Sequence, residues 1–298
     1  MNWGEYMRRI ISYYYHLEPK DIHQTKDYYD FIYNNEQYRI EQIKNINVDE
    51  VYDRMIYLRN NGIYVHEIIP TVENKLYIVY EQRKYALIKY IGNIGRKITK
   101  KDLLTFSNIK INVESKNWGK LWSEKIDYFE YQMSQFGMKY KNIRETFAYY
   151  IGLAEMGISL FNNYKIDDSY IQHYRINEKT TLYDLYDPFN IVYDLKVRDM
   201  ASYYKTKYIN DNLDINEIFT YLDTLDNYNK IMFFIRMFYP SFYFDEYEKV
   251  VNYTQDENDI IKIIKKSKNY HLLLKKIYDF LLLKINMPYI ELFINPIQ

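Results

Sequence analysis

The sequence predicts an α+β protein in which a small antiparallel sheet with one helix precedes a mostly helical half. Three observations support this class. Up to about residue 92, short runs rich in β-branched and aromatic residues alternate with turn residues. From about residue 117, apolar residues recur at the helical period of about 3.6 residues. Between Tyr170 and Leu195 short extended runs return, so we expect a small strand region inside the helical half.

The first half opens with a predicted hairpin. Residues 28–33 (YYDFIY) and 38–43 (YRIEQI) have the composition of strands, and residues 34–37 (NNEQ) are the predicted turn. A helix follows, with Asn47 as its N-cap and Glu50 at the spacing of a capping box. Its predicted apolar face is Val48, Val51, Met55 and Leu58, and Asn60, Asn61 and Gly62 end it. Three further strands are predicted over residues 63–69, 76–81 and 84–91.

The second half is dominated by amphipathic helical patterns. The predicted helices cover residues 118–129, 143–161, 199–208, 215–225, 228–239, 257–266 and 270–285. Pro240 is expected to stop the helix before it, since proline cannot continue a helix. The extended runs IQHYRI, TTLYDLYD and FNIVYDL supply the predicted strands between Tyr170 and Leu195.

Composition restricts the classes of function. Forty basic and forty acidic residues leave no net charge that would draw the whole chain to nucleic acid or an anionic membrane. The basic run Lys97–Lys101 has no interleaved aromatic residues, so we interpret it as solvated surface. No apolar run reaches the roughly 18 residues of a membrane-spanning helix. The chain has no cysteine, which excludes disulfides, thiolate metal sites and cysteine nucleophiles. The first residues lack signal-peptide character, so we expect an intracellular protein.

A small sheet with one helix, followed by a helical half with a short strand region, is the layout of a two-lobed protein kinase. Element order alone fits a generic α+β protein equally well. In the kinase interpretation, residues 1–92 form the N-terminal lobe and residues 93–298 form the helical C-terminal lobe.

Four stretches favour the kinase layout because they resemble segments of the kinase-like spore-coat proteins of the CotS and YutH type. Residues 148–155 (AYYIGLAE) resemble the helix before the catalytic loop, and residues 120–130 (KLWSEKIDYFE) resemble an earlier helix. Residues 198–205 (RDMASYYK) resemble the segment after the loop. Residues 236–245 (RMFYPSFYFD) resemble a stretch of the YutH-type branch and are the most specific of the four. The resemblance implies the fold of the aminoglycoside and choline phosphotransferases.

The same resemblance implies an endospore-forming bacterium as the source. It also implies synthesis in the cytoplasm of the mother cell, deposition in the spore coat, and other spore-coat proteins as partners. No nucleic acid and no membrane insertion are expected. The 38 tyrosines are explained either by codon bias or by a role in assembly, through aromatic contact surface or oxidative cross-linking.

The catalytic loop of such a fold, with the pattern H-x-D-x-x-x-x-N, is predicted to be degenerate here. His173, Tyr174 and Arg175 align with H-x-D. Arg175 then replaces the aspartate that accepts the substrate proton, and a guanidinium group stays protonated at physiological pH. Thr180 replaces the metal-binding asparagine, and a single hydroxyl is a poorer metal ligand than an amide oxygen.

The lysine that holds the nucleotide phosphates is also predicted to be missing. Glu41 occupies its position in the second strand, or Arg39 if the alignment shifts. A glutamate would repel phosphates, and an arginine keeps the charge without the geometry. The hairpin turn at residues 34–37 contains no glycine, so its backbone is not suited to close over phosphates.

Asp194 remains as a candidate metal ligand, since residues 191–194 form a strand that ends where the family keeps its metal-binding aspartate. The alternative is that Asp194 caps the next helix or pairs with Arg198. Asp199 is expected to cap that helix or to hold the loop. Asp184 and Asp187 could serve as substitute bases, although turn chemistry explains Asp187 before Pro188.

The sequence therefore predicts a pseudokinase that acts as a structural or scaffolding component of the spore coat, with no cofactor. The rival hypothesis is a divergent phosphotransferase that uses Mg-ATP, with Asp194 and a base from elsewhere, and acts on a coat protein or a small hydroxyl metabolite.

Overall fold

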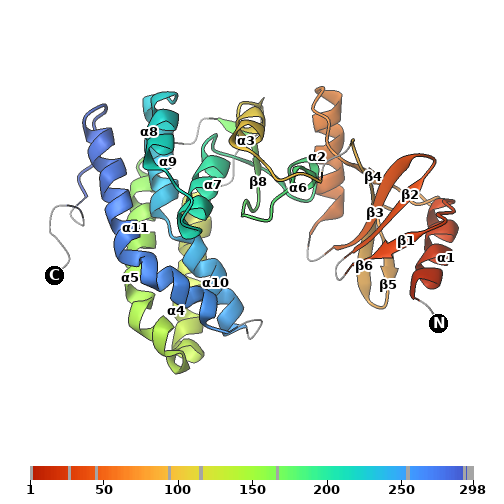
Figure 1. The fold of residues 1–298 in the computed structure, drawn as a ribbon, viewed down its shortest axis with the longest axis horizontal. Helices are drawn as coiled ribbons and strands as arrows, with labels where there is room; N and C mark the ends of the chain where they lie inside the picture. The colour runs from red at the N-terminus through yellow and green to blue at the C-terminus, as the bar shows by residue number, and fades with distance from the viewer. Residues whose placement is uncertain are drawn as a thin grey trace. The chain divides into compact units, whose positions relative to one another are not determined.

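The computed structural model describes residues 3–25, 28–43, 46–92, 95–113, 117–165, 168–252, 256–290 and 293. The chain forms two compact units. Unit 1 contains residues 1–98 together with 179–191, and unit 2 contains residues 99–178 and 192–298. The expected fold class is confirmed: unit 1 is built on an antiparallel sheet, and unit 2 is mostly helical (Figure 1).

Within the described residues, the sheet of unit 1 has six strands. The order is β1-β2-β3-β6-β4, with β5 also paired to β6, and every pair is antiparallel. The strands are β1 (Ile22–Gln24), β2 (Tyr28–Tyr33), β3 (Glu36–Ile43), β4 (Glu67–Ile69), β5 (Ile78–Tyr80) and β6 (Arg83–Lys89).

The turn between β2 and β3 is tighter than predicted. It consists of Asn34 and Asn35 alone, with φ angles of 50° and 61°. Two positive φ values match the right-handed twist of a hairpin, and asparagine tolerates them better than most residues. Glu36 and Gln37, predicted to lie in the turn, belong to β3.

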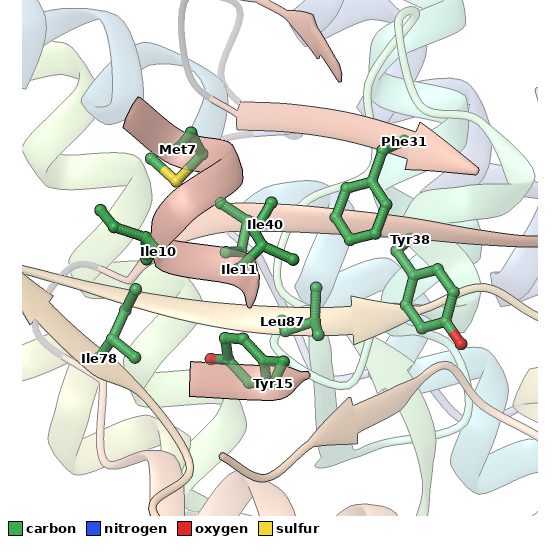
Figure 2. Packing of buried hydrophobic residues seen from close by; sticks show 9 residues of the cluster. All are labelled: Met7, Ile10, Ile11, Tyr15, Phe31, Tyr38, Ile40, Ile78 and Leu87. Carbon is green, nitrogen blue, oxygen red and sulfur yellow. The ribbon is translucent and has the colours of Figure 1, made fainter. Parts of the chain in front are cut away.

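An N-terminal helix that the sequence did not reveal completes the core of unit 1. Helix α1 (Trp3–Tyr15) packs against the sheet (Figure 2). Its tyrosine-rich sequence has a β-type composition, yet its apolar residues follow helical spacing. The core cluster comprises Met7, Ile10, Ile11, Tyr15, Phe31, Tyr38, Ile40, Ile78 and Leu87.

The alternation of side chains along β3 separates the apolar face of the sheet from a charged face. Tyr38 and Ile40 belong to the core beneath α1. Because successive side chains of a strand point to opposite faces, Arg39 and Glu41 lie on the other face. That face is where the candidate phosphate-binding position falls.

Helix α2 (Val48–Asn60) confirms its predicted cap and apolar face. The Asn47 side chain accepts a hydrogen bond from the Asp49 amide at 3.2 Å. Glu50 does not complete a standard capping box; it accepts from the Asn47 side-chain amide at 3.1 Å. All four predicted apolar residues of the helix are buried.

Unit 2 places a three-stranded sheet, in the order β7-β8-β9, among its helices. Its strands are β7 (Lys110–Ile111), β8 (Ser169–His173) and β9 (Ile191–Asp194), the last beginning at the unit boundary. Its helices are α3 (Lys100–Ser107), α4 (Trp118–Gln135), the 3-10 turn η1 (Gly137–Lys139), α5 (Lys141–Asn162), α7 (Arg198–Ile209), α8 (Ile215–Asp223), α9 (Asn227–Phe238), α10 (Ser241–Val251) and α11 (Asn258–Leu282). Helix α5 packs against α4, α9 and α11.

Several predicted elements of the second half were wrong. Residues 182–186 form a short helix, α6 (Leu182–Tyr186), instead of a strand, because Thr181 and Asp184 form a capping box. Helix α10 was missed because Pro240 was interpreted as a stop, whereas it also precedes a new helix start. The two predicted terminal helices are one continuous helix, α11. Among the described helices, none combines the length and hydropathy needed to cross a bilayer.

Candidate functional site

Asp194 lies at the end of β9, where the resemblance implies a metal-binding carboxylate. Its side chain is fully buried. Its Oδ2 atom accepts from Arg198 at 2.6 Å and from Arg236 at 2.5 Å. Its Oδ1 atom accepts from Arg236 at 2.7 Å and from the Leu195 amide at 2.6 Å. A carboxylate offers about four lone-pair sites, so these contacts use its full capacity.

Two tryptophans of α4 line the arginine pair. The Arg198 Cζ lies 4.5 Å from the Trp118 ring centroid, and the Arg236 Cζ lies 4.9 Å from it. Arg236 is also 4.8 Å from the Trp122 centroid. Guanidinium groups stack favourably on such rings. Burial lowers the pKa of Arg236 to about 10, with Asp194 opposing the shift, so Arg236 stays protonated at neutral pH.

His173, at the end of β8, is held by the first turn of α7. Its Nδ1 lies 2.6 Å from Asp199 Oδ2, and its backbone amide donates to Asp199 Oδ1 at 2.9 Å. The Arg198 Nε donates to the His173 carbonyl at 3.0 Å. Of the two roles expected for Asp199, the structure therefore supports holding the loop.

Arg175, which the sequence aligns with the catalytic base, points largely to solvent, with 65% of its side chain exposed. Its Nη2 lies 3.6 Å from Oδ1 of Asp245 on α10. Burial raises the pKa of Asp245, while the Arg175 charge opposes that shift. Local sequence could not predict this contact, because Arg175 and Asp245 are 70 positions apart along the chain. Asp245 is thus a carboxylate beside the base position that sequence reasoning missed.

Lys205 connects two of the stretches that resemble the spore-coat proteins, residues 198–205 and 236–245. It is buried, and its Nζ donates to the Tyr239 carbonyl at 2.7 Å and lies 3.4 Å from Ser241 Oγ. Burial lowers the pKa of Lys205 to about 7, with the Arg236 charge adding to the effect. The lysine ties α7 to the turn between α9 and α10. Residues 198–205 and 236–245, recognised separately in the sequence, therefore form one connected polar network.

In unit 1, Arg39 is one of the two residues, with Glu41, that the sequence aligns with the phosphate-holding lysine. Its guanidinium forms a two-point ion pair with Asp30, at 2.8 and 3.1 Å. It also lies 3.5 Å from the Tyr28 ring centroid and 4.0 Å from that of Tyr183. Tyr90 donates to Asp30 at 2.8 Å. The cation is thus enclosed by a carboxylate and tyrosine rings.

Glu41, two residues along the same strand, is close to this cluster. Tyr183 Oη donates to Glu41 Oε2 at 3.3 Å. Burial raises the pKa of Glu41 to about 7, and the Arg39 charge opposes that rise. Neither residue reproduces the compact, accessible ammonium of a phosphate-holding lysine.

The remaining predicted residues have local structural roles in unit 1. Asp184 accepts from the Thr181 amide at 2.6 Å in the capping box of α6. Asp187 accepts from the Phe189 amide at 2.9 Å, as turn chemistry predicts. Burial and the nearby Glu41 raise the pKa of Asp187 well above its usual range. Thr180 is buried, and its carbonyl accepts from the Ile98 amide at 3.4 Å.

Within the described residues, no group of three or more histidine or acidic side chains has an arrangement that could hold a metal ion. The contacts around Asp194 also fit Mg²⁺ poorly, because guanidinium donors occupy the oxygens that a cation would need. The roles inferred from the sequence for His173, Arg175, Thr180 and Asp194 remain predictions. The arrangement is suited to holding segments together.

Comparison with known proteins defines the class. Residues 8–277 match the family model described as "Spore coat putative kinase YutH". The match covers most of the chain, so this protein belongs to the YutH family of kinase-like spore-coat proteins. A curated relative, the endospore coat-associated protein YutH of Bacillus subtilis (strain 168), is 24% identical over an alignment of 251 residues, and the match covers 73% of this chain and 74% of that protein.

Solved structures show the same fold. An aminoglycoside phosphotransferase from Alicyclobacillus acidocaldarius aligns with a TM-score of 0.62 at 9% identity, over 91% of this chain and 95% of that one. The choline kinase LicA from Streptococcus pneumoniae aligns with a TM-score of 0.53 at 14% identity, over 91% and 98% of the two chains. At these identities the likeness establishes the phosphotransferase fold alone.

Proposed function

We propose that this protein is a structural component of the endospore coat that uses a kinase-like fold as a scaffold and does not transfer phosphate. It is made in the mother-cell cytoplasm, moves to the coat and binds other coat proteins there. The name of the Bacillus subtilis relative supports this location.

The saturation of Asp194 is the observation that carries the proposal. A phosphotransferase of this fold needs an exposed carboxylate to hold Mg²⁺ against the nucleotide phosphates. Here the carboxylate at that position is fully buried and paired with two arginines. Arg175 adds support, because a permanent cation at the base position cannot accept a proton.

Calorimetry with Mg-ATP tests the absence of nucleotide chemistry. We expect no saturable heat, and no magnesium-dependent thermal shift of several degrees with ATP. An active aminoglycoside phosphotransferase serves as the positive control for the titration. Saturable, magnesium-dependent ATP binding by this protein would contradict the proposal.

Localisation during sporulation tests the proposed role in the spore coat. A fluorescent fusion produced from the native promoter should appear in the mother-cell cytoplasm and then form a ring at the spore surface. A signal that stays diffuse in the mother cell throughout sporulation would contradict a coat role.

Asp245 favours a second candidate function, a divergent Mg-ATP-dependent phosphotransferase acting on a coat protein or small hydroxyl metabolite. Its carboxylate lies 3.6 Å from the Arg175 guanidinium, and burial raises its pKa above the ordinary value of an aspartate. A carboxylate beside the predicted base position is a candidate proton acceptor. Under this alternative the purified protein transfers phosphate, and Asp245→Asn abolishes transfer while leaving the fold intact. Absence of transfer by the parent protein rejects it.

A further inference from the structure

Two exposed helix faces of unit 2 carry opposite charges. The first, the α4 face, is acidic and aromatic, with Tyr128 and Tyr131 exposed by 48% and 62%. The second, the α11 face, is basic, with Leu272 exposed by 48%. The α4 face consists of Glu124, Asp127, Tyr128 and Tyr131, and the α11 face consists of Lys265, Lys268, Leu272 and Lys276.

The two faces have the same internal spacing. On α4, Asp127 and Tyr131 follow Glu124 by three and seven residues, and on α11 Lys268 and Leu272 follow Lys265 by three and seven. At about 3.6 residues per turn, residues at these spacings share one side of a helix. Two such helices laid side by side in parallel place each acid opposite a lysine and Tyr131 opposite Leu272.

The charges on both faces are available to a partner. Asp127, Lys265 and Lys268 form no ion pair with any other described residue. Glu124 meets Lys120 at 3.8 Å, with both side chains mostly exposed, and such surface pairs contribute little. By contrast, the flanking Lys262 and Lys275 are paired along α11 with Asp259 and Asp279.

Because both faces are exposed in the single chain, they do not neutralise each other within it. We infer that the α4 face of one copy binds the α11 face of a second copy. The contact is heterologous, so each added copy leaves one free α4 face and one free α11 face. Such contacts produce rings or open filaments instead of a closed two-fold dimer. The inference deepens the proposed scaffold role, on which it rests, by naming a second copy of this chain as a partner.

Charge reversal tests the inference in the full-length protein. Variant A carries Glu124→Lys and Asp127→Lys, so both of its faces are basic. Variant B carries Lys265→Glu and Lys268→Glu, so both of its faces are acidic. We expect the parent protein to associate in sedimentation velocity at about 0.05 M salt and to dissociate progressively toward about 0.5 M.

Each variant alone should associate at least about tenfold more weakly than the parent, since attractions become repulsions. An equimolar mixture of A and B should regain association, because each face then meets its opposite on the other variant. The matched control, Glu145→Lys with Glu155→Lys on the exposed surface of α5, changes net charge as variant A does and should associate like the parent. Circular dichroism verifies that each variant is folded.

A parent protein that stays monomeric at low salt, or a mixture of A and B that does not regain association, would overturn the inference. So would variants that associate as well as the control. The test of self-association is independent of the test of nucleotide binding. Mg-ATP binding would contradict the proposed lack of phosphate transfer and leave the contact between copies unaffected. A mixture of A and B that does not associate would contradict the contact between copies and leave the proposed function unaffected.

Discussion

Asp194 is expected to stabilise the fold instead of holding a metal ion, and Asp194→Asn separates the two roles. The substitution keeps the shape of the side chain and removes its charge. Arg198 keeps acceptors in the carbonyls of His173 and Tyr174, at 3.0 and 3.2 Å. Arg236 loses the charge of its ion-pair partner while remaining almost fully buried.

The expected loss follows from leaving buried cations uncompensated. Removing one partner of a buried ion pair costs about 3–5 kcal/mol. For a chain of this size, each kcal/mol lowers the melting temperature by roughly 2–4 °C, so the total shift is roughly 6–20 °C. The free energy of unfolding is measured by urea denaturation followed by circular dichroism.

Asp245→Asn is the matched control, because Asp245 meets its arginine at 3.6 Å on a partly exposed surface. Such a pair contributes at most about 1 kcal/mol. A double variant, Asp194→Asn with Arg236→Met, should recover part of the loss, since the stranded guanidinium is then absent. A structural role for Asp194 is refuted if Asp194→Asn costs no more than the control, or if the parent binds magnesium and the variant does not.

Three further substitutions test other parts of the structure. The folded-state pKa of Lys205, about 7, lies below its ordinary value of 10.5. The unfolded state therefore binds more protons between these two values, and the free energy of unfolding should rise with pH across that window. Lys205→Met should flatten this rise in urea denaturation, and an unchanged slope would count against a lowered pKa of Lys205. Ile11→Ala should cost about 2–5 kcal/mol by opening a cavity beneath α1 and should increase proteolysis of the N-terminal segment; equal protease resistance would speak against α1 packing. Asn35→Val should cost about 1–2 kcal/mol because its φ is positive, whereas Asn35→Gly should be neutral or stabilising, and a reversed order would reject the two-residue turn.

Most of the fold could be predicted from local patterns. The strands flanking Asn34 and Asn35, helix α2 and the long helices α4 and α5 follow from periodicity and capping residues. The errors have physical causes. The β-type composition of α1 conceals its helical spacing. Pro240 follows the end of α9 and directly precedes the start of α10. The rule that proline ends a helix predicts the end of α9 but does not predict that α10 begins after it.

The site could be predicted in part. Local sequence was enough to propose that Asp194 pairs with Arg198, since the two are four residues apart. It could not predict Arg236, which is 42 positions from Asp194 and reaches it through the packing of α9. The resemblance of residues 236–245 to the YutH-type branch was the available signal, but it gave no partner for the arginine. The contact of Asp245 with Arg175 could not be predicted either, because the two residues are also far apart in the sequence.

Unit 1 is not a continuous stretch of chain, because residues 179–191 belong to it. Tyr183, from this segment, packs against Arg39 and donates to Glu41. During synthesis the sheet therefore leaves the ribosome before the segment that covers its charged face. At about 5–20 residues per second, the intervening chain takes roughly 5–20 s to emerge. Throughout that delay Arg39 and Glu41 lack their contacts with Tyr183, so we expect the nascent sheet to be a target for chaperones that bind unfinished domains.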